Sequence, residues 1–162
     1  IVACLVEEWE WLNNFLKHNK KHLLPHERDN VWHFVEAYIA FAQKRFDDVI
    51  GSLSNVDDIS DPSMVLRFKA LQLRAYYEQH GRNDLVYDYA KSFELFLKRH
   101  KKKFNENTFA AYSNLIVFVR KLIRKKLNIQ LLKDEIIACQ ALFFRGWLLG
   151  KIELIEKNIQ SP

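Results

Sequence analysis

Glycine and proline restrict the fold of this chain most, because it has so few of them. Four Gly and three Pro occur among 162 residues, about 4 % of the chain against roughly 12 % in average proteins. Tight turns, phosphate-cradling loops and many-stranded β folds depend on these two residues. At the same time 49 % of the residues are hydrophobic, which is more than a disordered chain carries. The sequence therefore predicts an ordered chain with few tight turns.

Apolar residues recur at helical spacing along almost the whole chain, and no segment shows sustained strand-like alternation. In the first expected helix, for example, Leu5, Trp9, Leu12 and Leu16 share one face. We predict an all-α fold of about eight helices in a single domain over residues 1–162. The helices are expected at residues 3–19, 28–43, 45–55, 62–80, 84–100, 106–127, 129–143 and 145–159.

Residues that begin or end helices stand at several of these boundaries. Side chains that cap helix starts precede three of the expected helices, and Pro62 suits a first helical position. Asn128 is expected to end the helix over 106–127, and Gly81 suits the end of the helix over 62–80. The remaining glycines fall inside or beside helices, where we expect close packing or a helix break. The capping residues are Asp61, Asn83 and Asn105, and the remaining glycines are Gly51, Gly146 and Gly150.

Two segments of the chain share a pattern at a fixed interval. Residues 37–49 carry small residues before an aromatic that opens the next helix, and residues 75–84 look like the same region again. Gln43 and Gln79 are 36 residues apart, near the length of about 34 residues of a tetratricopeptide repeat. Roughly residues 30–100 resemble that family. The resemblance implies stacked antiparallel helical hairpins forming an α-solenoid, and a closed helical bundle is the alternative fold.

The compartment of the protein is read from its cysteines and its apolar runs. Cys4 and Cys139 belong to no metal-binding or redox motif, which favours a reducing, cytoplasmic location, although one long-range disulfide is an alternative. No apolar run approaches the roughly 18 residues that a membrane span needs, so we expect no membrane segment. The chain opens at Ile1 without an initiator Met, and we interpret it as part of a longer protein.

Residue patterns that carry catalysis are missing from the sequence. No GxxxxGK[ST], GxGxxG, HExxH or GxSxG motif occurs, so we expect neither an enzyme nor a bound cofactor. His18, His22 and His26 have a spacing that could bind a metal in an unbroken helix. Pro25 interrupts that helix, and no further ligand completes the set, so no metal site is expected.

Positive charge is concentrated in the second half of the chain. Residues 1–81 hold 9 Lys and Arg against 12 Asp and Glu, whereas residues 82–162 hold 16 against 8. The two main basic runs, 98–103 and 120–126, lie near opposite ends of one expected helix, about 27 Å apart at 1.5 Å per residue. In a stack of antiparallel helices alternate loops share an edge, and one such edge is positive. The candidate residues of this basic edge are Lys44, Arg45, Arg82, Arg124, Lys125 and Lys126.

Aromatic residues provide the second candidate surface. Phe34, Tyr38 and Phe41 follow the stripe that lines the inner surface of tetratricopeptide arrays, where they could form an apolar groove for a helix or peptide, or belong to the core. We therefore expect a non-catalytic segment that mediates protein–protein contacts as a scaffold in a larger protein. The alternative is binding of nucleic acid or another anionic partner through the basic edge, which would weaken steeply with salt.

Overall fold

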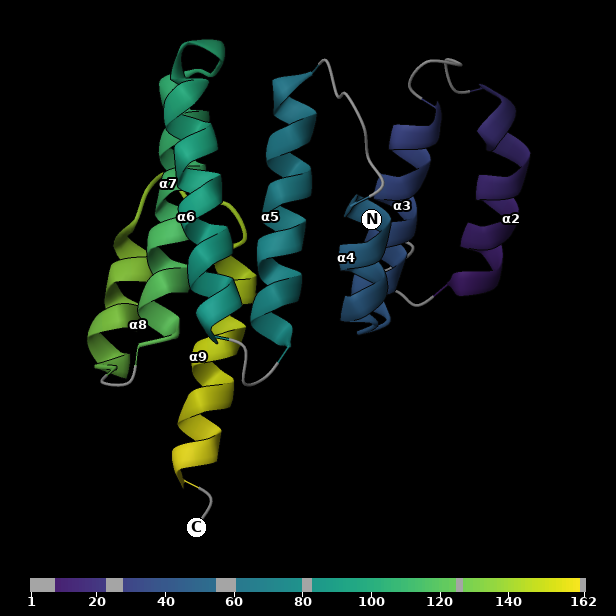
Figure 1. Ribbon diagram of the computed structural model, residues 1–162. Coiled ribbons are helices and arrows are strands. Elements are labelled where there is room, and N and C mark those ends of the chain that lie inside the picture. Colours follow the sequence, from purple (N-terminus) through teal and green to yellow (C-terminus); the bar gives the residue numbers. More distant parts are fainter. Residues whose placement is uncertain (1–7, 23–27, 55–60, 80–82, 125–126, 161–162) are drawn as a thin grey trace. The chain divides into compact units, whose positions relative to one another are not determined.

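The computed structural model describes residues 8–22, 28–54, 61–79, 83–124 and 127–160, and within them it is all-helical (Figure 1). Eight α-helices and two short 3₁₀ helices occur in these ranges, with no strand among them, and each α-helix overlaps one of the predicted helices. The all-α prediction is confirmed. The chain divides into two compact units, residues 1–81 and 82–162, and each unit is described by itself. The single domain and the solenoid arrangement remain predictions.

The first unit is built around a core of three packed helices. α4 (Phe46–Ser54) packs against both α3 (Arg28–Ala42) and α5 (Pro62–Glu78), and α3 also contacts α5. Asp61 caps α5 as predicted, accepting a hydrogen bond from Ser63 N at 2.9 Å, with Pro62 in the first turn. The elements are α2 (Trp9–Asn19), η1 (Lys20–His22), α3 (Arg28–Ala42), α4 (Phe46–Ser54) and α5 (Pro62–Glu78). The buried cluster consists of Ala37, Ala40, Val49, Leu53, Phe68, Leu71 and Ala75.

The turn between α3 and α4 is closed by backbone hydrogen bonds. Arg45 N donates to Ala40 O at 2.8 Å, and Lys44 N donates to Phe41 O at 3.0 Å. Lys44 adopts a φ of 60°, the left-handed conformation that usually falls to Gly at the end of a helix. The tight link brings the two helices into a packed pair.

The second unit contains two helical hairpins. α6 packs on α7, α8 packs on α9, and α7 also contacts α8. Asn105 caps α7 as predicted, because its side chain accepts a hydrogen bond from Thr108 N at 2.7 Å. The elements are α6 (Asn83–Arg99), η2 (Lys101–Lys103), α7 (Glu106–Leu122), α8 (Ile129–Ala138) and α9 (Arg145–Gln160). The largest fully buried side chains of the second unit are Val86, Phe93, Leu97, Leu115, Ile116, Ile136, Leu148 and Ile152.

Two helix ends differ from the predictions. α7 ends at Leu122 rather than near residue 127, and Asn128 caps the start of α8 by accepting a hydrogen bond from Leu131 N at 3.0 Å. α8 stops at Ala138 rather than 143, because the following carbonyls bond to side chains of other segments. The Asn114 amide donates to the carbonyl of Ala141 at 2.9 Å. The prediction missed these ends because apolar periodicity continues through both turns.

The helical glycines are not sites of close packing. A Cβ added at Gly51, Gly146 or Gly150 would meet no atom within 4 Å, and α4 and α9 continue through them without a break. The expectation of close packing or a helix break was therefore wrong for these three. Gly81 lies outside the described residues, and Asn83 is the first residue of α6 rather than its cap.

Candidate functional site

The aromatic residues predicted to line a groove pack against the core of the first unit. Phe34, Tyr38 and Phe41 are all half-buried and contact the buried cluster. The ring of Phe34 stacks on Phe68 of α5 with centroids 4.7 Å apart, and Phe41 meets Phe46 of α4 at 5.5 Å. Much of their apolar surface therefore stabilises the three-helix core. Their role as a groove remains a prediction.

A buried arginine adds to this contact between α3 and α5. Arg74 is only 8 % exposed, and its guanidinium carbon lies 4.3 Å from the centroid of the Phe41 ring. Burial lowers the pKa of Arg74 below its usual value, whereas its hydrogen bond to Tyr38 and the charge of Glu78 act in the opposite direction. A cation over an aromatic face in a desolvated setting is an attractive contact. Phe41 is therefore held from the α5 side.

The residues of the predicted basic edge are only partly described. Lys44 and Arg45 lie at the α3–α4 turn of the first unit, where both are exposed, and Arg45 forms an ion pair with Asp48. Arg124 is exposed in the second unit, after the end of α7. The other three residues of the edge, Arg82, Lys125 and Lys126, lie outside the described residues, and the edge remains a prediction.

Two cations of the basic run near the end of α7 form ion pairs that join helices. Arg120 Nη1 lies 2.7 Å from Glu94 Oε2 of α6, and Lys121 Nζ pairs with Glu135 of α8. Glu94 also accepts from Lys98 Nζ at 2.6 Å. These hydrogen bonds, that of Lys98 first and that of Arg120 second, hold the pKa of Glu94 below its usual value. The charges of Arg120 and Lys121 are therefore compensated by carboxylates of neighbouring helices.

α2 carries an aromatic pair that the fold leaves exposed. Trp11 is 57 % and Phe15 is 48 % exposed, and their rings stack with centroids 5.2 Å apart and planes at 15°. At about 100° per residue, Trp11, Phe15, Leu12 and Leu16 occupy a continuous arc of about 140° around the helix. Leu12 is buried and Leu16 is half-buried. One side of this arc packs inward, and the other presents two stacked rings to solvent.

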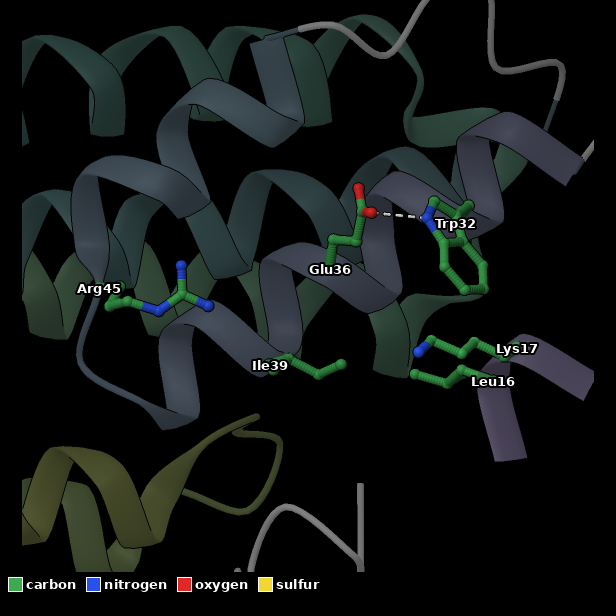
Figure 2. Close-up of a pocket in the computed structure, with 6 residues that line it drawn as sticks. All are labelled: Leu16, Lys17, Trp32, Glu36, Ile39 and Arg45. Atoms are coloured by element: carbon green, nitrogen blue, oxygen red, sulfur yellow. Dashed lines mark hydrogen bonds between the residues drawn. The ribbon is translucent and has the colours of Figure 1, made fainter. Parts of the chain in front are cut away.

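A pocket with a volume of about 230 Å³ lies beside this arc, between α2 and α3. Figure 2 shows Leu16 and Lys17 of α2 on one side of it and Trp32, Glu36 and Ile39 of α3 on the other. Trp32 Nε1 donates a hydrogen bond of 2.6 Å to Glu36 Oε1, which fixes the indole ring. Arg45 completes the lining. The pocket thus has apolar walls from Leu16, Trp32 and Ile39, with the charged groups of Lys17, Glu36 and Arg45 around them.

Trp11 and Phe15 were not among the candidate residues predicted from the sequence. The predicted inner face of this helix consisted of Leu5, Trp9, Leu12 and Leu16. Leu12 and Leu16 lie on that face as predicted, Leu5 lies outside the described residues, and the side chain of Trp9 is not described. Two further aromatics next to that stripe make the apolar arc wider than one packed face requires. That width is the signal by which they could have been found.

Two of the sequence-based expectations concern metal binding and membrane spans. In residues 8–22, 28–54, 61–79, 83–124 and 127–160, no group of His, Cys, Asp and Glu is arranged to hold a metal ion. His26, one of the three spaced histidines, lies outside these ranges. None of the described helices combines the length and apolarity required to span a membrane.

Comparisons with family models, with curated protein sequences and with solved structures find no match to the chain.

Proposed function

We propose that the chain is a non-catalytic segment that binds a protein partner through the aromatic face of α2. The observation that supports this proposal is the exposed stack of Trp11 on Phe15. Large aromatic side chains are enriched where proteins contact each other, and they supply many of the strongest contacts. Stacked rings in water also have little conformational freedom left to lose, so a partner can cover them at a small entropic cost.

The chemistry of the surface describes the partner. The apolar arc and the neighbouring pocket suit an amphipathic helix or peptide that inserts apolar anchors. Lys17, His18 and Lys21 are exposed at the C-terminal end of α2 and just beyond it, so acidic residues in the partner would complement them there. Covering the exposed halves of two aromatic rings contributes roughly 2–3 kcal/mol to binding. Their loss should therefore weaken binding about 30- to 150-fold.

The wider role that we propose is that of a scaffold built from helical hairpins. The resemblance of residues 30–100 to tetratricopeptide repeats supports it, as do the packed pairs α3–α4, α6–α7 and α8–α9. In repeat arrays each hairpin buries its apolar face against neighbours, and the assembled surface binds proteins. On this proposal the aromatic face of α2 is one binding surface of such a scaffold.

Site-specific photocrosslinking tests the proposed surface. A photoreactive amino acid is placed at Phe15 in the full chain, and at Glu10 on the opposite side of the same helix as the control. A partner that is captured from position 15 and not from position 10 is then titrated against purified wild-type and Trp11→Ala/Phe15→Ala proteins. We expect the 30- to 150-fold loss of affinity given above, with Glu10→Ala within about twofold of the wild type.

Two results would count against this function. The first is crosslinking from position 15 that is no greater than from position 10. The second is an unchanged dissociation constant for the double variant. Because about half of each of these side chains is exposed, the variant should keep the helical circular dichroism of the wild type, and loss of that signal would show that the rings belong to the core.

A further inference from the structure

The link between α6 and α7 carries a dense group of exposed cations. α6 ends at Arg99, the 3₁₀ helix η2 spans Lys101–Lys103, and α7 begins at Glu106. Arg99, Lys101, Lys102 and Lys103 are all exposed, and together they are called the basic tip. None of them forms an ion pair with a carboxylate in the part of the chain that the structure describes. Their charge is therefore available to an external partner.

The basic tip differs in this respect from the neighbouring cations. Lys98 is paired with Glu94 at 2.6 Å, and Arg120 and Lys121 are paired with carboxylates of adjacent helices. The sequence alone presents two similar basic runs, at 98–103 and 120–126. The structure pairs Arg120 and Lys121 of the second run with carboxylates, whereas Arg99 and Lys101–Lys103 of the first run form no ion pair within the described ranges.

Helix dipoles do not account for the three lysines. Cations stabilise the C-terminal end of a helix, which explains the positions of Lys98 and Arg99 in the last turn of α6. Lys101–Lys103 lie beyond that end and just before the N-terminus of α7, where the dipole repels positive charge. The charge that does suit this helix start is the negative one of Glu106, in the first turn of α7. A lysine triplet at this position is therefore not explained by the stability of the two helices.

The geometry of the tip indicates which polyanion it fits. Side chains in a 3₁₀ helix are about 120° apart, so the three lysines point in different directions around the link instead of sharing one face. Lys101 Nζ lies 5.3 Å from the centroid of the Phe109 ring, which places one of the three cations against α7. A flat bilayer surface meets the cations on only one side of such a fan, whereas the two phosphate strands that border a nucleic-acid groove lie on either side of an inserted tip.

The apolar surface near the tip also argues against the other classes of partner. Within residues 99–103 no large apolar side chain is present, and the nearest strongly exposed one among the described residues is the single Leu95, one turn before Arg99 on α6. A protein interface needs an apolar anchor, and stable attachment to a membrane needs an acyl chain or an inserted apolar face besides the basic cluster. We infer that the basic tip binds the phosphate backbone of duplex nucleic acid without reading its sequence. This surface is separate from the protein-binding face proposed on α2.

Binding through the basic tip should depend steeply on salt concentration. With four cations each neutralising one phosphate, the slope of log K against log salt should be about −3.6 for B-form DNA. Affinity should then fall about 150-fold between roughly 50 and 200 mM salt. Scrambling the base sequence should leave the affinity within about twofold, because backbone contacts carry no sequence information.

The test measures fluorescence anisotropy of labelled DNA and RNA duplexes of about 20 base pairs with the full chain, over this range of salt. The variant Lys101→Gln/Lys102→Gln/Lys103→Gln removes the triplet. The control Arg67→Gln/Lys91→Gln/Lys157→Gln removes the same charge from three other exposed positions. We expect the triplet variant to make the salt slope shallower, from about −3.6 to about −0.9, and the control to leave the slope unchanged. Because Lys101 contacts Phe109, Lys102→Gln/Lys103→Gln serves as a second variant, with an expected slope of about −1.8.

Several results would overturn the inference. An equal loss in the triplet and control variants would show that net charge alone drives binding. Binding to neither duplex at low salt would show that the tip is not a nucleic-acid surface. A salt slope that the triplet variant leaves unchanged would show that binding does not pass through the tip. Tighter binding to phosphatidylserine vesicles or to polyglutamate than to either duplex, with loss in the triplet variant, would assign the tip to a membrane or to an acidic protein instead.

Discussion

The carboxylate of Glu94 links α6 to α7, and the substitution Glu94→Gln tests how much it stabilises the second unit. Its Oε2 lies 2.7 Å from Arg120 Nη1, and its Oε1 lies 2.6 Å from Lys98 Nζ. Glutamine keeps the size of the side chain but removes its charge. Both cations then remain in place without a counter-charge, so the substitution measures the electrostatic contribution with little change in packing.

The two contacts differ in strength because they differ in exposure. The Lys98 side chain is 64 % exposed and pairs within one helix, which is worth about 0.3–0.5 kcal/mol. The Arg120 side chain is only 23 % exposed, and its buried Nε has no hydrogen-bond acceptor among the described residues. A hydrogen bond between charged groups in such a place contributes more, and the new amide retains part of it. We expect a total loss of about 1.5 kcal/mol, or about 3–6 °C in Tm.

The effect should depend on pH in a defined direction. The two hydrogen bonds hold the pKa of Glu94 below its usual value in the folded protein. A lowered folded-state pKa means that the ionised carboxylate adds stability at pH values above the ordinary glutamate range. That stability is lost as the pH falls through the lowered pKa. The difference between wild type and Glu94→Gln should therefore be largest near neutral pH and should shrink in acid.

Urea unfolding followed by circular dichroism, at neutral and acid pH, measures these quantities. Lys98→Gln is the matched control, since it removes only the exposed contact and should cost at most about 0.5 kcal/mol. A double-mutant cycle of Glu94→Gln with Arg120→Gln should give a coupling of at least about 0.5 kcal/mol. The reasoning would be refuted if Glu94→Gln and Lys98→Gln cost the same, or if the loss were equal at both pH values.

Two further predictions concern backbone conformation. Gly150→Ala should stabilise the protein by about 0.5–1 kcal/mol in the same urea assay, because α9 gains helix propensity and the added methyl group meets no atom within 4 Å; a loss of stability would show that α9 packs more closely there. Lys44→Gly should stabilise by up to about 1 kcal/mol, because Lys44 adopts a φ of 60° at the end of α3. Lys44→Ala keeps the strain and should stay within about 0.5 kcal/mol of wild type, so equal effects of the two substitutions would contradict this explanation.

Local sequence determined the helices and several of their starting points. A cap such as Asp61 or Asn105 acts on a backbone N–H two or three residues away, so the residues that form it are adjacent in the sequence. Apolar periodicity is likewise a property of one segment. For these reasons the positions of all eight described α-helices could be predicted before any tertiary contact was known.

Tertiary structure decided where α8 ends and which charged and aromatic side chains stay exposed and unpaired. The hydrogen bond that fixes the turn after α8 joins Asn114 to Ala141, and the ion pair that neutralises Arg120 joins it to Glu94. These partners are 27 and 26 residues apart, and nothing in either segment alone indicates the pairing.

Contacts between distant segments also distinguish the two candidate surfaces from similar stretches of sequence. The lysines of the basic tip look like the paired cations near the end of α7. The stacked aromatics of α2 likewise look like the half-buried aromatics of α3. Burial and pairing depend on what the neighbouring helices place opposite each side chain. The sequence by itself therefore determined a chain of few glycines and prolines that folds into helices, and only the packing of those helices separated the residues of the core from those left exposed on the surface.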